Sequence, residues 1–398
     1  MENLFLSLGV LLVTARVLGH LAKSCRQPAL LGELSAGILL GPTILGQIFP
    51  IQQQILFPSH GNLALVTSSF MAIAIALFLL VAGMEVDLSS VIRQRRSAFR
   101  ISFWGILGPF FLGFFSAAVS PGLWSAPSSN EPFLFALFLG TALSISALPV
   151  IARIMKDLNI YRSDLGMVVI TSAVITDLSG WLIFSVILGM MVPTAHPGTG
   201  FIRTLFLIFC FMAFLFTAGR WLVNRSATIG IALGGCLLCS AATEFIGIHS
   251  IFGAFLFGIV LGDSPRLQER TRATLDQFVS FFFAPLFFAS IGLKINFIKN
   301  FDPGLVAVTI ALATIGKVAG CGWGAFRSGF SKKESLSIGF GMNARGAMEI
   351  ILCLLALQTH LINERIFVAI VIMALATSAV SGSMMQFLGG GRTCWNKA

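Results

Sequence analysis

"VVITSAVITDLSGWLIFSV", at residues 168–186, is as apolar as a membrane-spanning helix, yet Asp177 lies at its midpoint. A charge at the centre of a bilayer costs about 3 kcal/mol, so an acid is rarely placed there without a use. The alternative is a structural acid that bonds a neighbouring helix. We therefore expect a transmembrane helix that carries a functional carboxylate.

The composition of the whole chain excludes a water-soluble globule. Of the 398 residues, 56% are hydrophobic and only 11% are charged, against about 25% charged in an ordinary soluble domain. Apolar segments of about 20 residues recur along the chain, which predicts an integral membrane protein, placed in the plasma (inner) membrane. The first segment lacks a basic n-region and a small-residue cleavage site, so we expect it to be a retained helix.

The same survey argues against other classes of protein. The net charge is +10, but the basic residues are spread over loops instead of one patch, so no nucleic-acid partner is expected. No nucleophile with a base, and no metal cluster, has the spacing that an enzyme needs. We therefore expect neither an enzyme nor a bound cofactor.

Apolar runs punctuated by Gly and Pro predict an all-α protein with thirteen transmembrane helices. These helices are expected at residues 3–23, 28–46, 62–86, 97–120, 132–156, 162–192, 200–223, 227–244, 248–263, 272–294, 303–328, 333–358 and 364–388. The loops after odd-numbered helices 1 to 11 and their adjoining helix ends, with the C-terminus, hold nineteen Lys and Arg residues, while the other loops with their helix ends hold four. The positive-inside rule then places the N-terminus outside and the C-terminus in the cytoplasm.

Two stretches of the second half echo the first. "LGELSAGILLG" (31–41) aligns without gaps to "FGAFLFGIVLG" (252–262), and "LFLLVAGMEVDL" (77–88) aligns to "LFFASIGLKINF" (286–297). Each pair joins expected helices that are seven apart, and an odd offset reverses the orientation in the membrane. The pattern predicts two inverted six-helix repeats, helices 1–6 and 8–13, with helix 7 as linker, which is typical of secondary transporters.

Corresponding helices of the two repeats carry helix-breaking residues. Helix 5 contains Pro149, which removes a backbone hydrogen bond. Helix 12 contains Gly339, Gly341 and Gly346, which loosen a helix. Irregular backbone at membrane depth is tolerated only around a protein-lined or watery cavity, so we expect helices 5 and 12 to break beside the substrate site.

Two mid-span charges stand near these breaks. Asp177 on helix 6 can bind a hard monovalent cation through oxygen, or a proton, and competition between the two couples their fluxes. Lys317 on helix 11 has some ten helical residues on either side, about 15 Å, which is too far for its ammonium to snorkel to water. We expect Lys317 to have a functional or pairing role.

Further polar residues surround the expected breaks. Arg345 and Glu349 are spaced i, i+4, so they can form a buried ion pair that holds helix 12 or can contact substrate directly. Neutral oxygens are available for a cation or for helix packing on Thr141, Ser144, Ser146 and Asn343. Glu33 and Glu244 are also acids within spans, but they lie outside the broken helices and are expected to serve packing or the cavity wall.

These residues together resemble a known family, the monovalent cation:proton antiporters, in the branch called cation:proton antiporter-2. The resemblance covers almost the whole chain and rests on motifs in the family's order: "GELSAGILLGP", "AGMEVDL", "LSISALPVIARIMKDL", the Asp177 helix, "PLFFASIGLKI", "GKVAG" and "NARGAMEI". It implies a homodimer in which helices 5 and 12 break and cross. The implied parts are dimerisation-domain helices in 1–96 and 227–302, core-domain helices in 97–193 and 303–398, and a linker helix in 194–226.

The resemblance also implies roles for single residues. The family's ion-binding aspartate corresponds to Asp177, and its helix-11 lysine corresponds to Lys317. Electrogenic members carry two adjacent acids, whereas this chain has Thr176 in the first position. We therefore expect electroneutral exchange of one cation for one proton. Many relatives append cytosolic nucleotide-binding domains, and because this chain ends ten residues after helix 13, such regulation is not expected.

The sequence thus predicts a secondary antiporter that exchanges Na+ or K+ for H+ by elevator-type alternation of the core. Asp177 is expected to bind cation and proton in turn, with Thr176 and the two breaks completing the site. Two alternatives remain: a gated K+ efflux pathway with the same fold, and a non-transporting membrane sensor. Sequence does not choose between Na+ and K+, because selectivity depends on cavity size and ligand number.

Overall fold

The computed structural model describes residues 2–24, 27, 29–58, 61–86, 95–124, 132–158, 160, 163–191, 199–225, 227–246 and 250–388. Every regular element in these residues is helical, in agreement with the all-α prediction. Nine of the described helices are long and apolar enough to cross a membrane, or ten if one bent pair counts as a single span. Three shorter apolar helices accompany them. The count of thirteen spans stays a prediction, and the short tail after residue 388 lies outside the described residues.

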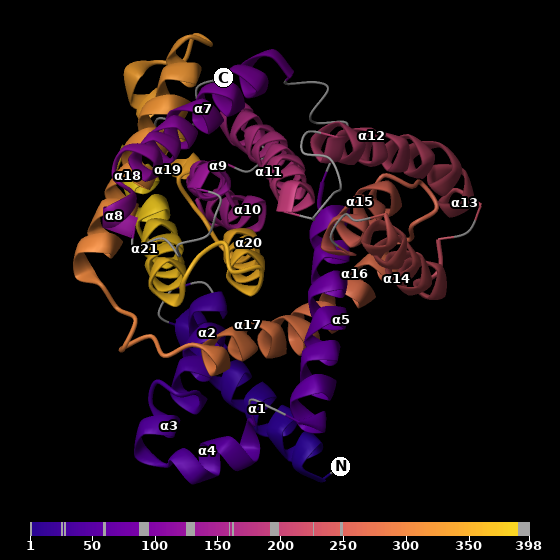
Figure 1. Cartoon of the computed structure of the whole chain (residues 1–398). Helices are drawn as coiled ribbons and strands as arrows, with labels where there is room; N and C mark the ends of the chain where they lie inside the picture. Colours follow the sequence, from indigo (N-terminus) through magenta and orange to yellow (C-terminus); the bar gives the residue numbers. More distant parts are fainter. Residues whose placement is uncertain are drawn as a thin grey trace. The chain divides into compact units, whose positions relative to one another are not determined.

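The chain divides into two units, each made of two separate segments. Unit 1 comprises residues 1–87 and 188–299, and unit 2 comprises residues 88–187 and 300–398 (Figure 1). The elements of unit 1 are α1 (Glu2–Ser24), α2 (Ala29–Leu40), α3 (Leu45–Ile48), α4 (Pro50–Leu56), α5 (Asn62–Met84), α12 (Thr199–Phe214), the π-helical turn η1 (Leu215–Gly219), α13 (Arg220–Val223), α14 (Ile229–Phe245), α15 (Ser250–Gly262), α16 (Glu269–Phe278), the π-helical turn η2 (Val279–Phe283) and α17 (Ala284–Lys294).

Unit 2 holds all the residues that the sequence places at the breaks. Its elements are α7 (Arg95–Val119), α8 (Pro121–Trp124), α9 (Pro132–Ser144), α10 (Leu148–Asp157), most of α11 (Asp164–Met191), α18 (Pro303–Phe326), α19 (Lys332–Met342), α20 (Ala347–Gln358) and α21 (Glu364–Leu388).

Glycines bring the helices of unit 1 into backbone contact. A Cβ atom added at Gly37 of α2 would lie 2.9 Å from the Cα atom of Gly292 in α17. A Cβ atom added at Gly83 of α5 would lie 2.9 Å from the Cα atom of Gly258 in α15. Such close approach is open only to residues without a side chain, as in small-residue packing of membrane helices. Both helix pairs therefore depend on their glycines.

Unit 2 is built around an equally close pair, α7 and α18. A Cβ atom at Gly108 of α7 would lie 2.7 Å from the carbonyl oxygen of Gly316, and one at Gly320 of α18 would lie 2.3 Å from that of Trp104. These contacts make α7 and α18 antiparallel neighbours. They fix the face of α18 that carries Lys317, which is fully buried.

The expected break in helix 5 is present, but it precedes the proline. Helix α9 ends at Ser144 and α10 begins at Leu148, so Pro149 lies inside the first turn of α10. The prediction that Pro149 itself interrupts the helix at mid-span is wrong in position. Proline is tolerated in the first turn, where N–H groups have no helical partner, so Pro149 fits just inside the start of α10. The residues without helical structure between α9 and α10 are 145–147.

The expected break in helix 12 lies between α19 and α20, whose axes bend by 46°. Of the three glycines expected to loosen the helix, only Gly346 falls in the break, and Gly339 and Gly341 are helical. These two glycines allow close packing instead. A Cβ atom at Gly339 would lie 2.7 Å from the carbonyl oxygen of Val318, and one at Gly341 would lie 2.7 Å from the Met385 sulfur.

Candidate functional site

The two breaks of unit 2 contact each other through their backbones. The N–H of Ala147 donates to the carbonyl oxygen of Ala344 at 3.0 Å, and the Ser146 hydroxyl donates to the carbonyl oxygen of Met342 at 2.8 Å. In a lipid environment every backbone polar group released by a break needs such a partner. The sequence-predicted residues Ser146 and Asn343 thus belong to one contiguous pair of breaks.

Asp177 lies on α11 and is only 3% exposed. Its Oδ2 atom accepts a hydrogen bond from the N–H of Leu148, the first residue of α10, at 3.3 Å. Its Oδ1 atom is buried and has no hydrogen-bond partner in the part of the chain that the structure describes. The start of a helix carries partial positive charge, which favours a carboxylate there. One oxygen of Asp177 is therefore held by the broken helix, while the other keeps its full accepting capacity.

The neutral site residues use their hydroxyl hydrogens within the protein. Thr176 donates to the carbonyl oxygen of Ser172 at 2.7 Å, and Thr141 donates to that of Leu137 at 2.7 Å. Ser144 lies between the carbonyl oxygens of Gly140, at 2.6 Å, and Ile106, at 3.1 Å. A hydroxyl that donates its hydrogen keeps two lone pairs on oxygen. These residues can thus act as ligands for a cation, although their present bonds serve the helices.

Asn343 follows the last residue of α19, and its side chain contacts α18. Its Nδ2 atom donates to the hydroxyl of Thr314 on α18 at 3.3 Å. Its Oδ1 atom is buried and has no hydrogen-bond partner among the described residues. Asn343 therefore offers a second buried oxygen acceptor in this unit, and Thr314 is the residue that orients it.

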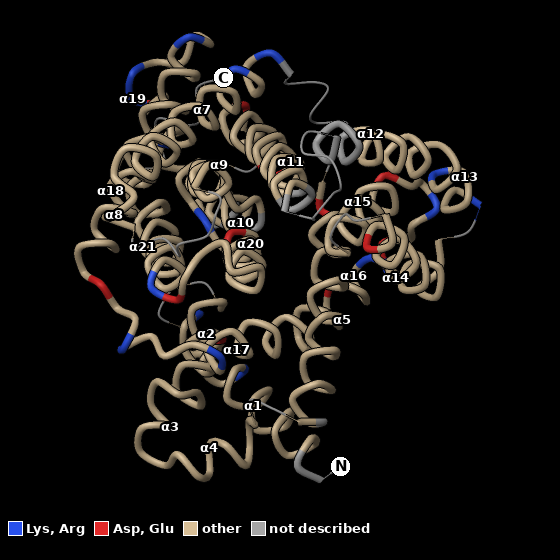
Figure 2. The backbone as a smooth tube through the Cα atoms, viewed as in Figure 1, with Lys and Arg blue, Asp and Glu red and all other residues tan. Residues whose placement is uncertain are grey.

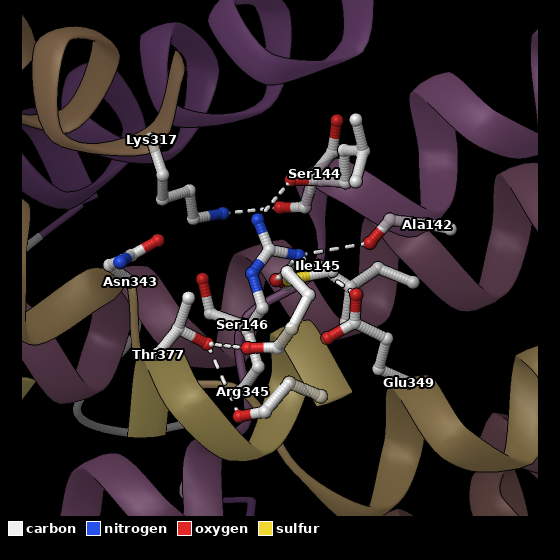
Figure 3. A network of polar contacts seen from close by, with 12 residues as sticks. Ala142, Ser144, Ile145, Ser146, Lys317, Asn343, Arg345, Glu349 and Thr377 are labelled. Carbon is white, nitrogen blue, oxygen red and sulfur yellow. Dashed lines mark hydrogen bonds and ion pairs between the residues drawn. The ribbon is translucent and has the colours of Figure 1, made fainter. Parts of the chain in front are cut away.

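Lys317 extends from α18 to the C-terminal end of α9 (Figure 3). Its ammonium group donates to the carbonyl oxygen of Ser144, the last residue of α9. Helix C-termini carry unpaired carbonyls and partial negative charge, which favour a cation. Within the described structure Lys317 forms no ion pair with Asp177 or Glu349. The partner of this lysine is the backbone of the broken helix.

Arg345 and Glu349 form the buried ion pair that their spacing allows, with 3.1 Å between Nη1 and Oε1. The guanidinium also covers the end of α9, because Nη1 donates to the carbonyl oxygens of Ala142 at 3.0 Å and Ile145 at 3.3 Å, while Nη2 donates to that of Leu143. Figure 3 shows this group between the two breaks. Arg345 thus ties the second break to the carbonyls that the first break leaves without helical partners.

Sequence reasoning missed two residues that hold the site. Ser378 of α21 accepts from the N–H of Arg345 at 3.0 Å and donates to the carbonyl oxygen of the same residue. Thr314 orients Asn343, as described above. Both hydroxyls sit in apolar helices, where they are common and carry no individual signal. Thr377, Ser378 and Ser381 in α21 do recur at one-turn spacing, and that stripe could have indicated a polar face.

Glu33 and Glu244, the other two acids that the sequence places within spans, both belong to unit 1. Glu33 on α2 is 6% exposed and packs against Gly19 of α1, where a Cβ atom would lie 3.3 Å from the Glu33 Cγ atom. Glu244 is exposed near the end of α14, and its Oε2 atom accepts from the N–H of Ser250 at the start of α15, at 2.8 Å. Both acids thus contact neighbouring helices of unit 1.

Comparison with known proteins gives a consistent set of similarities. The sequence profile of the family described as "Sodium/hydrogen exchanger, transmembrane" matches residues 8–389. The "Na(+)/H(+) antiporter NhaS4" of Synechocystis sp. (strain ATCC 27184 / PCC 6803 / Kazusa) is 30% identical over 391 residues, covering 94% of each chain. "Cation/H(+) antiporter 20" of Arabidopsis thaliana is 30% identical over 408 residues, which cover 95% of this chain and 47% of the plant protein. The chain thus spans about half the length of that relative.

A solved structure is similar over nearly its full length. It is that of the sodium proton antiporter MjNhaP1 from Methanocaldococcus jannaschii, with a TM-score of 0.70, and the match covers 98% of this chain and 100% of that one. The two sequences are 16% identical. At this identity the likeness concerns the fold.

Proposed function

The chain is an integral membrane protein that belongs to the sodium/hydrogen exchanger family, and from this we propose that it is a secondary antiporter exchanging Na+ or K+ for H+ across a plasma membrane. The family supports cation:proton exchange in general. The observation that carries the proposal for this chain is the Asp177 carboxylate. It is buried, it is held by one oxygen at the start of α10, and its other oxygen lacks a partner in the described structure.

Competition at Asp177 is the proposed coupling step. A carboxylate oxygen with no internal partner can bind a proton or a hard monovalent cation, but one site does not hold both. The remaining ligands of the cation are proposed to come from Thr176, from Asn343 and from the oxygens of α9 and its break, on Thr141, Ser144 and Ser146. Each of these side chains is at most 3% exposed, so a cation bound there leaves most of its water behind.

One proton for one cation is the proposed stoichiometry. A second proton carrier needs an ion pair that opens when the cation binds and closes when it leaves. Lys317 contacts the carbonyl of Ser144, Glu349 contacts Arg345, and Thr176 is neutral. Among the described residues of the site, Asp177 is the one carboxylate without an ion-pair or hydroxyl partner, so we take Asp177 itself as the exchanging group.

The proposed topology has thirteen spans in two inverted repeats, with the N-terminus outside and the C-terminus in the cytoplasm. The glycine contacts of unit 1 support it. Gly37 corresponds to Gly258 in the sequence repeat, and Gly83 corresponds to Gly292. A two-fold relation between the repeats turns the contact of Gly37 with Gly292 into the contact of Gly258 with Gly83, and both contacts occur.

Transport is proposed to follow an elevator-type cycle in a homodimer. In this proposal the helices of 97–193 and 303–398 form the moving core that carries Asp177. The helices of 1–96 and 227–302 form the dimerisation domain, and 194–226 holds the linker helix. Contact between the two breaks supports movement of the core as one body. Ala147 bonds Ala344 across the breaks, and Arg345 bonds Ala142 at the end of α9. Lys317 ties α18 to the same end of α9.

The direct test is proton movement driven by cation gradients in proteoliposomes that hold the purified chain and a pH-sensitive dye. Pulses of Na+, K+ and Li+ are compared with choline as the control. Proton movement with Na+ or K+ is the expected result. Rapid cation flux without proton movement would select a gated K+ efflux pathway instead, and no flux at any pH would favour a non-transporting sensor.

A further inference from the structure

A groove on unit 2 runs between α18 and α19, and none of the proposed cation ligands lines it. It has a volume of about 580 Å3 and an almost wholly apolar wall, formed among others by Ile315, Val318, Ala319, Gly322 and Leu336. Ile315 is 62% exposed and Leu336 is 41% exposed, so the groove opens to the outside of the protein. A segment buried in lipid presents such a surface to acyl chains.

The length of the groove matches one leaflet of a bilayer. Its lining residues on α18 extend from Thr314 to Phe326. Twelve helical steps of 1.5 Å give about 18 Å, and half of the hydrocarbon core of a bilayer is about 15 Å. One extended acyl chain therefore fits along α18 from the membrane surface to the bilayer centre.

One end of the groove is basic. Lys332 lines it directly, and a second depression of about 690 Å3, which shares Trp323 and Phe326 with the groove, is lined by Arg100 and Arg327. The Arg100 Nη1 atom donates to the backbone carbonyl oxygen of Arg327 at 3.2 Å, which holds the Arg100 side chain at the end of α18. Figure 2 shows basic residues in blue where α7 and α19 begin.

These three cations have no counter-ion among the described residues. All are exposed, and none forms an ion pair within the part of the chain that the structure describes. The nearby acid Glu334 is already engaged, because its Oε2 atom accepts from the N–H of Ser331 at 2.9 Å in a capping box. Basic side chains gathered at the end of an apolar groove complement a molecule with an anionic head and a hydrocarbon tail.

A neighbouring groove provides a contrast. It has a similar volume, about 550 Å3, and is lined by α7 residues such as Leu107, Leu112 and Phe115 together with Leu312 of α18. No charged residue lines it. That groove can accept acyl chains but offers nothing to a charged headgroup.

We propose that the groove between α18 and α19 is a specific site for one anionic phospholipid of the bilayer. Its phosphate is held by Arg100, Arg327 and Lys332, and one acyl chain lies along α18. The deep end of the groove is Thr314, whose hydroxyl accepts from Asn343. A bound chain thus packs behind the second helix break and stabilises it. By the proposed topology, the leaflet that holds this lipid is the cytoplasmic one. The lipid site itself does not depend on that topology.

Lipid binding by the purified full chain in detergent tests the proposal without any transport measurement. Native mass spectrometry measures binding of dioleoyl phosphatidylglycerol and of dioleoyl phosphatidylcholine, which differ in headgroup charge but not in chains. The expected result is one phosphatidylglycerol molecule bound at least about tenfold more tightly than phosphatidylcholine, since each basic residue adds to the attraction for an anionic lipid. Equal affinity for the two lipids would overturn the proposal.

Two variants locate the headgroup. The double substitution Arg327→Gln with Lys332→Gln is expected to bring the preference for phosphatidylglycerol down to about twofold or less, because two of the three cations are lost. The control, Arg266→Gln with Arg270→Gln, removes the same charge from exposed positions of unit 1 and should keep the preference. Equal loss in both would show that binding depends on net charge alone and would refute the site.

A second pair of variants locates the acyl chain. Ala319→Trp fills the groove from an exposed position. It is expected to abolish binding of phosphatidylglycerol to the purified chain. Leu112→Trp fills the uncharged groove and should leave it bound. Retention of the lipid in Ala319→Trp contradicts the proposal. A change from dimer to monomer in that variant also contradicts it, because the occupant is then a second copy of this chain.

Discussion

The backbone N–H of Ala147 donates to the carbonyl oxygen of Ala344 at 3.0 Å, which joins the break of one helix to the break of another almost two hundred residues later. Neither residue has a functional side chain. The bond nevertheless satisfies two backbone groups that a lipid environment would leave unpaired at a cost of several kcal/mol. It joins the break between α9 and α10, whose two helix ends contact Lys317 and Asp177, to the break between α19 and α20.

The ion pair in the second break predicts unequal effects of its two members. Arg345→Gln removes the partner of Glu349 and of three carbonyl oxygens at the end of α9, whereas Glu349→Gln leaves the carbonyl contacts of Arg345 in place. We expect Arg345→Gln to cost about 3 to 5 kcal/mol of stability, as for a broken buried pair, and Glu349→Gln to cost less. Thermal unfolding in detergent measures both. A larger loss from Glu349→Gln would contradict the assignment of Arg345 as the residue that holds the break.

The helices of the fold could be predicted from sequence because burial in lipid demands long apolar runs, and their ends follow from charge, Pro and Gly. The helix expected at 303–328 is α18 (Pro303–Phe326), and that expected at 62–86 is α5 (Asn62–Met84). The exact break positions could not be predicted. Pro149 and Gly341 mark the right helices, but proline is tolerated just inside a helix and glycine also serves close packing.

The contacts of the candidate site were less accessible to sequence reasoning. The i, i+4 spacing indicated the pair of Arg345 with Glu349, since both lie on one helix segment. The partner of Lys317 is a backbone carbonyl, which every residue carries and which no residue type can signal. The contact of Ser378 with Arg345 joins helices far apart in sequence and depends on tertiary packing alone.

Glycine contacts give a test of the repeat. Gly37→Ala places a Cβ atom 1.8 Å from the carbonyl oxygen of Ala289, and Gly258→Ala places one 2.3 Å from that of Leu80. Because the proposed repeat would make these positions equivalent, both should lower stability by about 1 to 3 kcal/mol or more through overpacking. Gly234→Ala is the control, since nothing lies within 4 Å of its added Cβ atom, and it should be neutral or stabilising. Thermal unfolding compares the three, and a neutral effect of either contact variant would speak against the equivalence.

The topology predicts where each terminus lies. Nineteen basic residues are expected on one side of the membrane and four on the other, which places the C-terminus in the cytoplasm and the N-terminus outside. Reporter domains that are active on only one side of the membrane, fused in turn to each terminus, measure this directly. A cytoplasmic N-terminus together with a cytoplasmic C-terminus would mean that the number of spans is even.

Lys317 is predicted not to carry a transported proton, because its ammonium is held by a carbonyl oxygen and no acid of the described residues is paired with it. Exchange should therefore be insensitive to membrane potential, and Lys317→Gln should still exchange while changing pH dependence and stability. Cation-driven proton flux at several clamped potentials measures this in proteoliposomes. Thr176→Asp supplies the second adjacent acid and should introduce voltage dependence. A wild-type reversal potential that moves with voltage, and no longer does so in Lys317→Gln, would restore the lysine as a carrier.

Asp177 is the residue on which the account depends, and the most direct measurement is cation-driven proton flux of Asp177→Asn in proteoliposomes. The variant keeps the size of the side chain but removes the charge that we propose to bind cation and proton in turn. Asp164→Asn is the matched control, since it makes the same change at an exposed position on the same helix. The account predicts that Asp177→Asn inserts and folds but exchanges no protons for Na+ or K+, that Asp177→Glu keeps at most partial activity because its carboxylate is displaced by about 1 Å, and that Asp164→Asn transports normally. Exchange by Asp177→Asn at the wild-type rate would contradict it.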